Sequence, residues 1–338
     1  MTLPLLVLPR WNPRFVVTAP MSADAEAVLH FYNPPGALAK AGVSAARKVM
    51  KGPHRDTLNL IAIPADADTS AAAAFAAEAL SELLGKNGWC LFGWTGSPGH
   101  ERKLTFCGYD SAASTPLAFA KINAVGAIRA RRLIQREAKI LDRLAESSLR
   151  DSSPRRLQLS ESSQFVCLLS EPLPGNRLSS RSGIDQARVD FLKRLRTEET
   201  NGTFAGLILS GSSSDTTAAH GDFTPWNLRQ SLTGRLSCFD WEFLARRALG
   251  WDICHHELQI AGYFERTPVW LAAPRLTTHI ISILSAAYSF TESEAARHLG
   301  VYCAESLKTG EGRPSLSRRA TALRRAVLTL ATGARYDR

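Results

Sequence analysis

Two short motifs in the second half of this 338-residue chain contain the side chains best suited to chemistry. Residues 220–227 read HGDFTPWN, and residues 239–242 read FDWE. Transfer of a phosphoryl group from a nucleoside triphosphate needs a carboxylate that orients the attacking hydroxyl. It also needs amide and carboxylate oxygens that hold Mg²⁺. The residue types and their spacing predict that Asp222 is the orienting carboxylate and that Asn227 and Asp240 are the metal ligands.

The segment between the two motifs has the pattern of a short β-hairpin. A strand that starts at Leu228 is followed by a Leu-Thr-Gly turn at residues 232–234 and by a second strand at residues 235–239. Glycine in such a turn is typical of hairpins. Because a hairpin brings its two ends together, we expect Asn227 and Asp240 to face one metal ion.

Lys121 and Glu137 form a second candidate pair. Lys121 lies near the end of an apolar strand predicted over residues 117–122, where it is either a cation for nucleotide phosphates or an edge-strand lysine that discourages aggregation. Glu137 falls within the apolar stripe of a helix predicted over residues 128–146. It is either buried or an exposed residue among six flanking basic side chains. A carboxylate on a buried face needs a cation beside it, so we expect an ion pair with Lys121.

A glycine-rich turn lies between two predicted strands near the start of this region. Residues 95–101 read TGSPGHE, and Gly96 and Gly99 would let backbone N–H groups approach nucleotide phosphates. The alternative is an ordinary hairpin turn. The spacing differs from the GxGxxG loop of protein kinases.

Several polar residues near the motifs are interpreted as structural. We expect Asp252 to anchor the loop that carries Asp222, and His220 to brace that loop by hydrogen bonds. His255 and His256 precede Glu257 on a predicted helix. Because the two histidines lack the spacing of a zinc protease site, both are predicted to be structural.

Together, these residues resemble the aminoglycoside phosphotransferase and choline kinase-like family, which has the bilobal protein-kinase fold. The resemblance covers about residues 89–262 and depends mainly on the two motifs. It implies that Asp222 is the catalytic aspartate and that Asn227 and Asp240 bind Mg²⁺.

The resemblance also implies a nucleotide site for ATP. Lys121 and Glu137 correspond to the phosphate-binding lysine and its glutamate partner. The Pro- and Gly-rich linker at residues 171–175 corresponds to the hinge against which adenine stacks. There, Glu171 and Leu173 are the expected contacts.

The pattern of strands and helices predicts an α+β protein with a bilobal, protein-kinase-like fold. Residues 1–86 are expected to form a small α/β appendage, residues 87–172 an N-lobe of antiparallel strands plus one helix, and residues 173–338 a mainly helical C-lobe. The predicted strands lie at residues 15–17, 27–31, 58–63, 89–94, 103–109, 117–122, 157–160 and 164–170. Besides the helix at 128–146, the predicted helices lie at residues 36–51, 69–84, 187–199, 254–263, 276–288 and 316–330.

Composition and charge indicate which cellular location and which binding partners to expect for this protein. The formal net charge is +10, and residues 313–338 hold seven arginines against one aspartate. Such a surface either attracts anionic ligands, nucleic acid or an anionic membrane, or is a solvated basic face. The six cysteines are scattered without a CxxC pair, which favours the reducing cytoplasm. The longest apolar stretches are too short or too polar to span a bilayer, and no secretory signal is evident.

The function that these features predict is ATP- and Mg²⁺-dependent phosphorylation of a hydroxyl on a small molecule. The positive net charge disfavours polycationic aminoglycosides as acceptors and favours a sugar or a polysaccharide precursor. One alternative is a non-catalytic kinase-like module that binds nucleotide or acts as a scaffold. A nucleic-acid or membrane binder rests on charge alone, because the sequence has no zinc finger, helix-turn-helix or RNA-binding motif.

Overall fold

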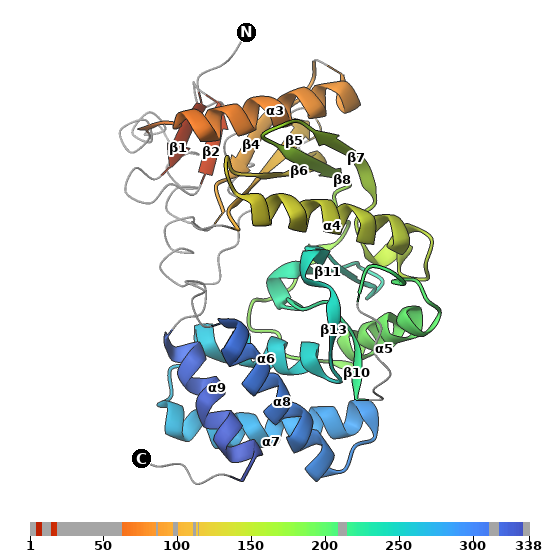
Figure 1. Ribbon diagram of the computed structural model, residues 1–338, viewed down its shortest axis with the longest axis vertical. Coiled ribbons are helices and arrows are strands. Elements are labelled where there is room, and N and C mark those ends of the chain that lie inside the picture. The colour runs from red at the N-terminus through yellow and green to blue at the C-terminus, as the bar shows by residue number, and fades with distance from the viewer. Residues whose placement is uncertain are drawn as a thin grey trace. The chain divides into compact units, whose positions relative to one another are not determined.

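The structure is a computed structural model that describes residues 5–8, 15–18, 63–85, 87–96, 101–110, 113, 115–208, 215–310 and 318–333 (Figure 1). The strand expected at 27–31, the helix at 36–51 and nearly all of the strand at 58–63 lie outside these residues. The chain divides into two compact units. One comprises Met1–Asp142 and Pro154–Pro172, and the other comprises Arg143–Ser153 and Leu173–Arg338.

The first unit is built on one antiparallel sheet, whose described strands follow the order β3-β1-β2-β4-β5-β6-β8-β7. The strands are β1 (Leu5–Leu8), β2 (Phe15–Thr18), β3 (Ile63–Pro64), β4 (Cys90–Trp94), β5 (Lys103–Asp110), β6 (Thr115–Asn123), β7 (Arg156–Glu161) and β8 (Val166–Ser170). Strands β4 to β8 match the strands predicted from residue 89 onward.

The segment expected as a separate N-terminal appendage contributes strands to this same sheet. Strand β2 pairs with β4 in an antiparallel register that places Phe15 opposite Trp94, and β1 pairs with both β2 and β3. Residues 1–86 and the strands that follow therefore belong to one compact unit. The physical reason is that the edge of β4 offers unpaired backbone groups, which β2 satisfies.

Helix α3 (Ala67–Leu84) covers part of this sheet. Its N-cap residue Asp66 accepts a hydrogen bond from the backbone N–H of Thr69 at 2.6 Å, and the helix ends at Gly85, whose φ is 82°. Small alanines and Leu80 on its buried face pack in one apolar cluster with Phe106 of β5 and with other sheet residues. Alanine side chains allow the helix backbone to approach the sheet closely.

Helix α4 (Ile128–Ala145) follows β6 and carries the apolar stripe that the sequence predicts. Ile134, Ala138 and Leu141 are almost completely buried, and Glu137 lies among them with only 4% of its surface exposed. The prediction that Glu137 is on the buried face is confirmed.

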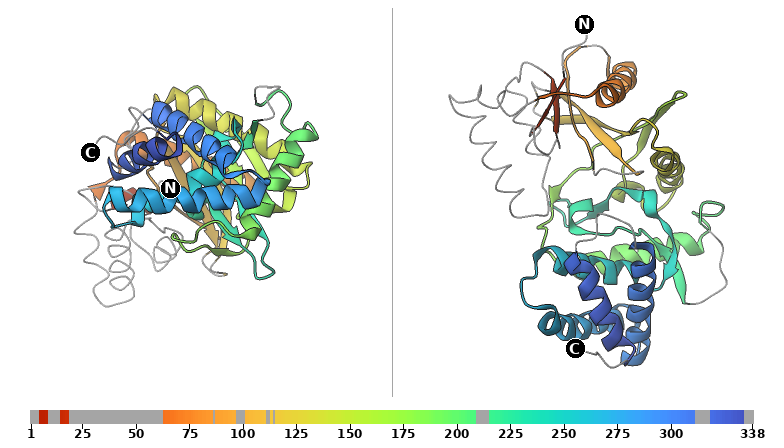
Figure 2. Two further views of the ribbon diagram at one scale, coloured as in Figure 1. Left: turned by 90° about the horizontal axis from the view of Figure 1, so that it is seen from below. Right: turned by 60° about the vertical axis from the view of Figure 1, so that its left-hand side comes forward.

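The second unit is mainly helical. Its helices are α5 (Gln186–Thr200), α6 (Trp251–Phe264), α7 (Val269–Tyr288), α8 (Glu292–Gly310) and α9 (Arg318–Ala331). Helix α9 packs against α6, α7 and α8, and these four helices cluster together in Figure 2. Helix α8 was not predicted from the sequence, and α7 begins seven residues earlier than expected.

The described residues of the second unit also form two small sheets and three single-turn 3₁₀ helices. One sheet joins β12 (Leu236–Cys238), β11 (Leu228–Gln230) and β9 (Asn176–Arg177), and the other joins β10 (Thr216–Ala219) and β13 (Ala245–Ala248). The 3₁₀ turns are η2 (Arg150–Ser152), η3 (Pro225–Asn227) and η4 (Trp241–Phe243).

This architecture is the protein-kinase-like α+β fold. Counted from β4, the third strand of the first unit is β6, which carries Lys121, and the next element is α4, which carries Glu137. Protein kinases place their phosphate-binding lysine and its glutamate partner on the corresponding strand and helix. None of the helices in the described residues is long and apolar enough to cross a membrane.

Candidate active site

In the sheet unit, the predicted ion pair is present. The Nζ atom of Lys121 lies 2.6 Å from Oε2 of Glu137, with the lysine side chain 18% exposed and the glutamate side chain 5% exposed. This distance is that of a short, charge-assisted hydrogen bond. The pair holds the lysine ammonium in one orientation, as a phosphate-binding lysine requires.

The strand that carries Lys121 is internal to the sheet. Lys121 is opposite Thr105 of β5 on one side and opposite Leu168 of β8 on the other. The alternative interpretation of Lys121 as an edge-strand residue is therefore wrong.

Asn123 fixes the end of the same strand. Its side-chain amide donates to the carbonyl of Gln164 at 3.0 Å and accepts from the backbone N–H of Val166 at 2.7 Å. These two bonds tie β6 to the start of β8.

The glycine-rich turn is described only in part. Gly96 has φ 63°, and a Cβ atom at this position would lie 2.1 Å from the carbonyl oxygen of Lys103. Both facts require glycine. Beside it, Nε of Arg102 donates to the carbonyl of Thr95 at 3.2 Å. Gly99 lies outside the described residues, so its phosphate-binding role stays a prediction.

The predicted linker contains Glu171 in one unit and Leu173 in the other. Glu171 pairs with Arg155 through both its backbone N–H and its carboxylate, at 2.9 Å and 2.5 Å. Leu173 is partly exposed. Gly175 ends the linker with φ 96°, and a Cβ there would lie 2.6 Å from the carbonyl oxygen of Gln230. The adenine contacts of Glu171 and Leu173 stay predictions.

In the helical unit, the predicted hairpin is confirmed. Strands β11 and β12 are antiparallel, with Leu228 opposite Cys238. One residue beyond, the backbone N–H of Phe239 donates to the carbonyl of Asn227 at 3.1 Å. The hairpin therefore brings the backbone at Asn227 next to the residue before Asp240.

Asp240 has a left-handed backbone, with φ 71° and ψ 52°. Besides glycines, the described residues with positive φ are Asp240 and Ser289. A left-handed non-glycine residue costs about 1–2 kcal/mol, although aspartate tolerates this conformation better than most residues. Such residues cluster at functional sites, and Asp240 directly precedes the turn η4.

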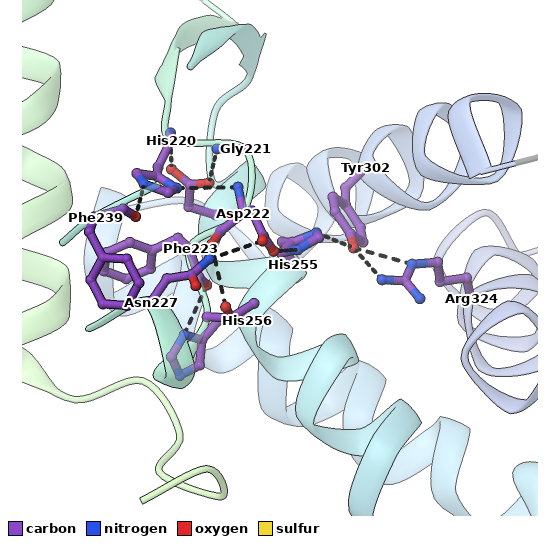
Figure 3. Close-up of polar contacts among 12 residues, drawn as sticks. His220, Gly221, Asp222, Phe223, Asn227, Phe239, His255, His256, Tyr302 and Arg324 are labelled. Atoms are coloured by element: carbon purple, nitrogen blue, oxygen red, sulfur yellow. Dashed lines mark hydrogen bonds and ion pairs between the residues drawn. The ribbon is translucent and has the colours of Figure 1, made fainter. Parts of the chain in front are cut away.

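Asp222 accepts hydrogen bonds on both carboxylate oxygens (Figure 3). Nδ2 of Asn227 donates to Oδ2 at 2.9 Å and to the main-chain oxygen of Asp222 at 2.9 Å. Nε2 of His255 lies 3.0 Å from Oδ1. The Asp222 side chain is 26% exposed, so the carboxylate is held on two sides and still reaches the surface of this unit.

The loop that carries Asp222 is held by Asp252, at the start of α6. The Asp252 carboxylate accepts from the backbone N–H groups of His220 and Gly221, at 2.7 Å and 3.0 Å. Burial raises the pKa of this carboxyl, although both hydrogen bonds and the nearby His220 lower it. Asp252 is therefore the anchor that the sequence predicts.

His220 braces the loop from inside, as expected. Its fully buried ring lies 3.1 Å from the carbonyl of Phe239 through Nε2, and Nδ1 accepts from the backbone N–H of Asp222 at 3.3 Å. The ring also packs edge-on against Trp241, with centroids 4.7 Å apart. Through His220, the Asp222 loop is linked to the end of the hairpin (Figure 3).

His256 has a structural position, in agreement with the sequence interpretation. Its buried ring contacts two carbonyls, with Nε2 2.8 Å from Ser182 and Nδ1 3.1 Å from Phe223. Burial lowers the pKa of His256 to about 4.

Sequence reasoning assigned no role at the site to His255, Tyr302 or Arg324. The available signal for His255 was its position three residues after Asp252, because residues three apart share a helix face. Tyr302 lies on α8, which begins with a capping box: the backbone N–H of Thr291 donates to Glu294, and that of Glu294 to Thr291 Oγ1. This box was legible in the sequence, whereas the contact of Tyr302 with His255 was not.

No known protein-family model matches the sequence, and no curated protein matches it. Solved structures similar to this chain include the aminoglycoside phosphotransferase APH(3'')-Id from Streptomyces rimosus ATCC10970 in complex with ADP and streptomycin. That match has 14% identity and a TM-score of 0.43, and covers 65% of this chain and 93% of that chain.

Two further matches are to choline kinase LicA from Streptococcus pneumoniae and to the gentamicin–APH(2")-IIa complex. LicA is 14% identical, with 75% of this chain and 97% of that chain covered and a TM-score of 0.44. The gentamicin complex is 13% identical, with 80% and 96% covered and a TM-score of 0.44. Aminoglycoside phosphotransferases and a choline kinase are thus among the structures to which this chain is similar.

Proposed function

We propose that this chain is an ATP- and Mg²⁺-dependent phosphotransferase that moves the γ-phosphate to a hydroxyl of a small molecule. The observation that carries the proposal is the arrangement at the hairpin. A partly exposed carboxylate, Asp222, is held by Asn227 at one end of the hairpin, and Asp240 follows the other end.

Asp222 is proposed to orient the attacking hydroxyl. Each oxygen of an ionised carboxylate can accept about two hydrogen bonds, and each Asp222 oxygen accepts one from the protein. The remaining capacity lets the carboxylate accept the hydroxyl proton of an acceptor, which aims the oxygen at the phosphorus atom.

Asn227 and Asp240 fit a magnesium site by the chemistry of their donor atoms. Because Nδ2 of Asn227 is turned to Asp222, its Oδ1 is the amide atom left for a metal. Carboxylate and amide oxygens are the ligands that Mg²⁺ prefers. A bound Mg²⁺ would neutralise phosphate charge during transfer.

The remaining nucleotide contacts are assigned to the sheet unit and the linker. Lys121, oriented by Glu137, is proposed to bind the phosphates. The turn with Gly96 and Gly99 would offer backbone N–H groups to the phosphates, and Glu171 and Leu173 would contact the adenine.

A sugar or polysaccharide precursor is the proposed acceptor class, in preference to an aminoglycoside. The chain has a formal charge of +10, which repels polycations. We also propose a cytoplasmic location. Its support is that all six cysteines are free thiols, five of them buried, as is usual in a reducing compartment.

The proposal is tested by comparing wild type, Asp222→Ala and Asp240→Ala. Phosphate release or transfer from ATP is measured with water, glucose, choline and streptomycin as acceptors, and binding of a non-hydrolysable ATP analogue is measured by calorimetry with and without Mg²⁺. Asp222→Ala should keep nucleotide binding but lose about 10³-fold in kcat, or about 4 kcal/mol of barrier. Asp240→Ala should lose the Mg²⁺-dependent part of binding.

The matched control is Asp190→Ala, because Asp190 is an exposed aspartate on α5 that accepts a hydrogen bond from Gln186. It should behave as wild type. A wild type that binds the analogue but turns over no ATP with any acceptor would instead indicate a non-catalytic nucleotide-binding module. A higher kcat/KM for streptomycin than for glucose would contradict the proposed acceptor class.

A further inference from the structure

A chain of polar side chains leads from Asp222 into the packed helices of the second unit. His255 of α6 contacts Asp222 through Nε2 at 3.0 Å, and its Nδ1 lies 3.3 Å from the hydroxyl of Tyr302 on α8. That hydroxyl lies 3.2 Å from Nε and 3.0 Å from Nη2 of Arg324 on α9. Figure 3 shows the four side chains in this order.

We propose that His255, backed by Tyr302 and Arg324, is a positioning residue that holds the carboxylate of Asp222 in its reactive orientation. The role rests on the proposed phosphotransferase function. These three side chains act differently from the loop anchors His220 and Asp252. The anchors bond to the backbone of the loop, whereas His255 bonds to the Asp222 carboxylate itself.

The hydrogen-bond directions along the chain are set by its ends. An arginine has only donors, and an ionised carboxylate has only acceptors. Arg324 therefore donates to the Tyr302 oxygen, and His255 donates from Nε2 to Asp222. The Tyr302 O–H is then available to donate to Nδ1 of His255, so the whole chain is satisfied by a neutral His255 with its proton on Nε2.

Tyr302 is suited to this donor role. Its side chain is fully buried. Burial raises the pKa of the phenol, although nearby Arg324 and a hydrogen bond from that residue oppose the shift. The phenol also has a hydrogen bond with Ser306, one turn along α8. A phenol that keeps its proton can fix the histidine tautomer.

Burying the Arg324 guanidinium is by itself unfavourable for the stability of the fold. It is fully buried, and its polar and ring contacts include the Tyr302 hydroxyl and ring and the carbonyl of Ala320. A buried cation costs several kcal/mol to desolvate, and apolar residues of similar volume are often neutral or stabilising replacements. A role in orienting Asp222 through Tyr302 and His255 accounts for this cost.

The expected effect on catalysis follows from geometry. Without the His255 bond, Oδ1 of Asp222 keeps no hydrogen-bond partner among the described residues, and the carboxylate can rotate away from the hydroxyl it must orient. A misplacement of about 1 Å costs about 10²-fold in rate. Loss of the His255 bond should not change nucleotide affinity, because His255, Tyr302 and Arg324 act on the Asp222 carboxylate, which is proposed to face the acceptor.

The test compares His255→Phe, which keeps the ring and removes the donor, with His255→Gln, which restores an N–H at a similar reach. The readouts are kcat and KM for ATP, with water as the acceptor. His255→Phe should lower kcat about 10- to 100-fold with KM for ATP unchanged, and His255→Gln should recover most of that loss. His279→Phe is the matched control, because His279 is a half-exposed histidine of the same unit.

Tyr302→Phe is a second test that leaves the His255 side chain unchanged. It keeps the proposal testable if the His255 variants do not fold. Nitrogen NMR of ring-labelled histidine in the full chain should show His255 protonated on Nε2 in wild type and a mixture of tautomers in Tyr302→Phe. An active wild type whose His255→Phe variant keeps its full kcat would overturn the proposal, as would an Nδ1-protonated His255 in wild type. A wild type without turnover on water, glucose, choline or streptomycin would overturn the phosphotransferase function itself, whatever the tautomer.

Discussion

The two units hold their key charged groups in different ways. In the sheet unit, Lys121 and Glu137 lie on consecutive elements, and one short ion pair at 2.6 Å joins them. In the helical unit, Asp222 is held by Asn227 and His255, and His255 is backed by Tyr302 and Arg324. One arrangement uses two neighbouring elements, and the other uses a loop, a hairpin and three helices.

The difference shows how many substitutions can disturb each group. A two-residue pair has no intermediate link, so removing either partner acts on it directly. A network distributes its support, so the loss of one distant member should weaken it by steps. Substitution in the ion pair should therefore cost more stability than substitution around the loop that carries Asp222.

Lys121→Met should be the most destabilising change. It removes the ammonium from the almost fully buried carboxylate of Glu137, and breaking a buried ion pair costs about 3–5 kcal/mol. Chemical denaturation should show this loss in the free energy of unfolding. Lys139→Met is the control, since Lys139 is exposed on α4, the helix that carries Glu137, and should change stability by less than about 0.5 kcal/mol. A loss below 1 kcal/mol for Lys121→Met would mean that the pair adds little to stability.

His256 should make stability depend on pH. Burial lowers its pKa to about 4, below the usual value near 6.5, so the folded state resists protonation. The stabilisation is present above about pH 6.5 and is lost as pH falls toward 4, by at most about 3 kcal/mol. Unfolding free energies of wild type and His256→Gln, measured from pH 4.5 to 7.5, should converge at the acid end.

A stability that rises as pH falls would point to the hydrogen bonds of His256 instead of its burial. Both ring nitrogens of His256 face carbonyl oxygens, those of Ser182 and Phe223, and only the doubly protonated ring can donate to both. If wild type gains stability over His256→Gln as pH falls, the two carbonyls outweigh burial and the expected direction is wrong.

Gly221→Ala should damage the loop that carries Asp222. Its φ is 87°, and an added Cβ would lie 2.5 Å from the carbonyl oxygen of Phe243. We expect a loss of about 2 kcal/mol in stability together with reduced turnover. Gly234→Ala separates backbone strain from steric overlap. Gly234 has φ 83°, but nothing lies within 4 Å of a Cβ atom added there. It should cost about 1 kcal/mol and leave turnover near wild type. Equal effects at both positions would show that the contact with Phe243 is unimportant.

Many strands and helices could be predicted from the sequence, because the pattern of apolar and turn residues within each segment specifies them. Short strand-like runs between turns identified β4 to β8, and an apolar stripe identified α4 and indicated that Glu137 is buried. The β11–β12 hairpin was predicted from its turn and flanking strands. Helix α8 was missed although Thr291 and Glu294 mark its start by a capping box.

The basic C-terminal segment shows the limit of such patterns. Its arginines suggested either an anion-binding surface or a solvated face. Arg324 belongs to neither, because it is fully buried against Tyr302. Composition reports the charge of a segment and cannot say which of its side chains turns inward.

The sequence by itself determined the chemical groups and the elements that carry them: the two motifs, Lys121 and Glu137 on a strand and the next helix, and a hairpin that joins Asn227 to the segment before Asp240. These depend on short-range geometry, which residue spacing specifies. The tertiary structure alone decided that β1 to β3 extend the sheet and that His255, Tyr302 and Arg324 line up behind Asp222. Those contacts join residues 33, 47 and 22 positions apart. Helical periodicity says which face of a helix is buried, but the packing of whole helices selects the neighbour that each side chain meets.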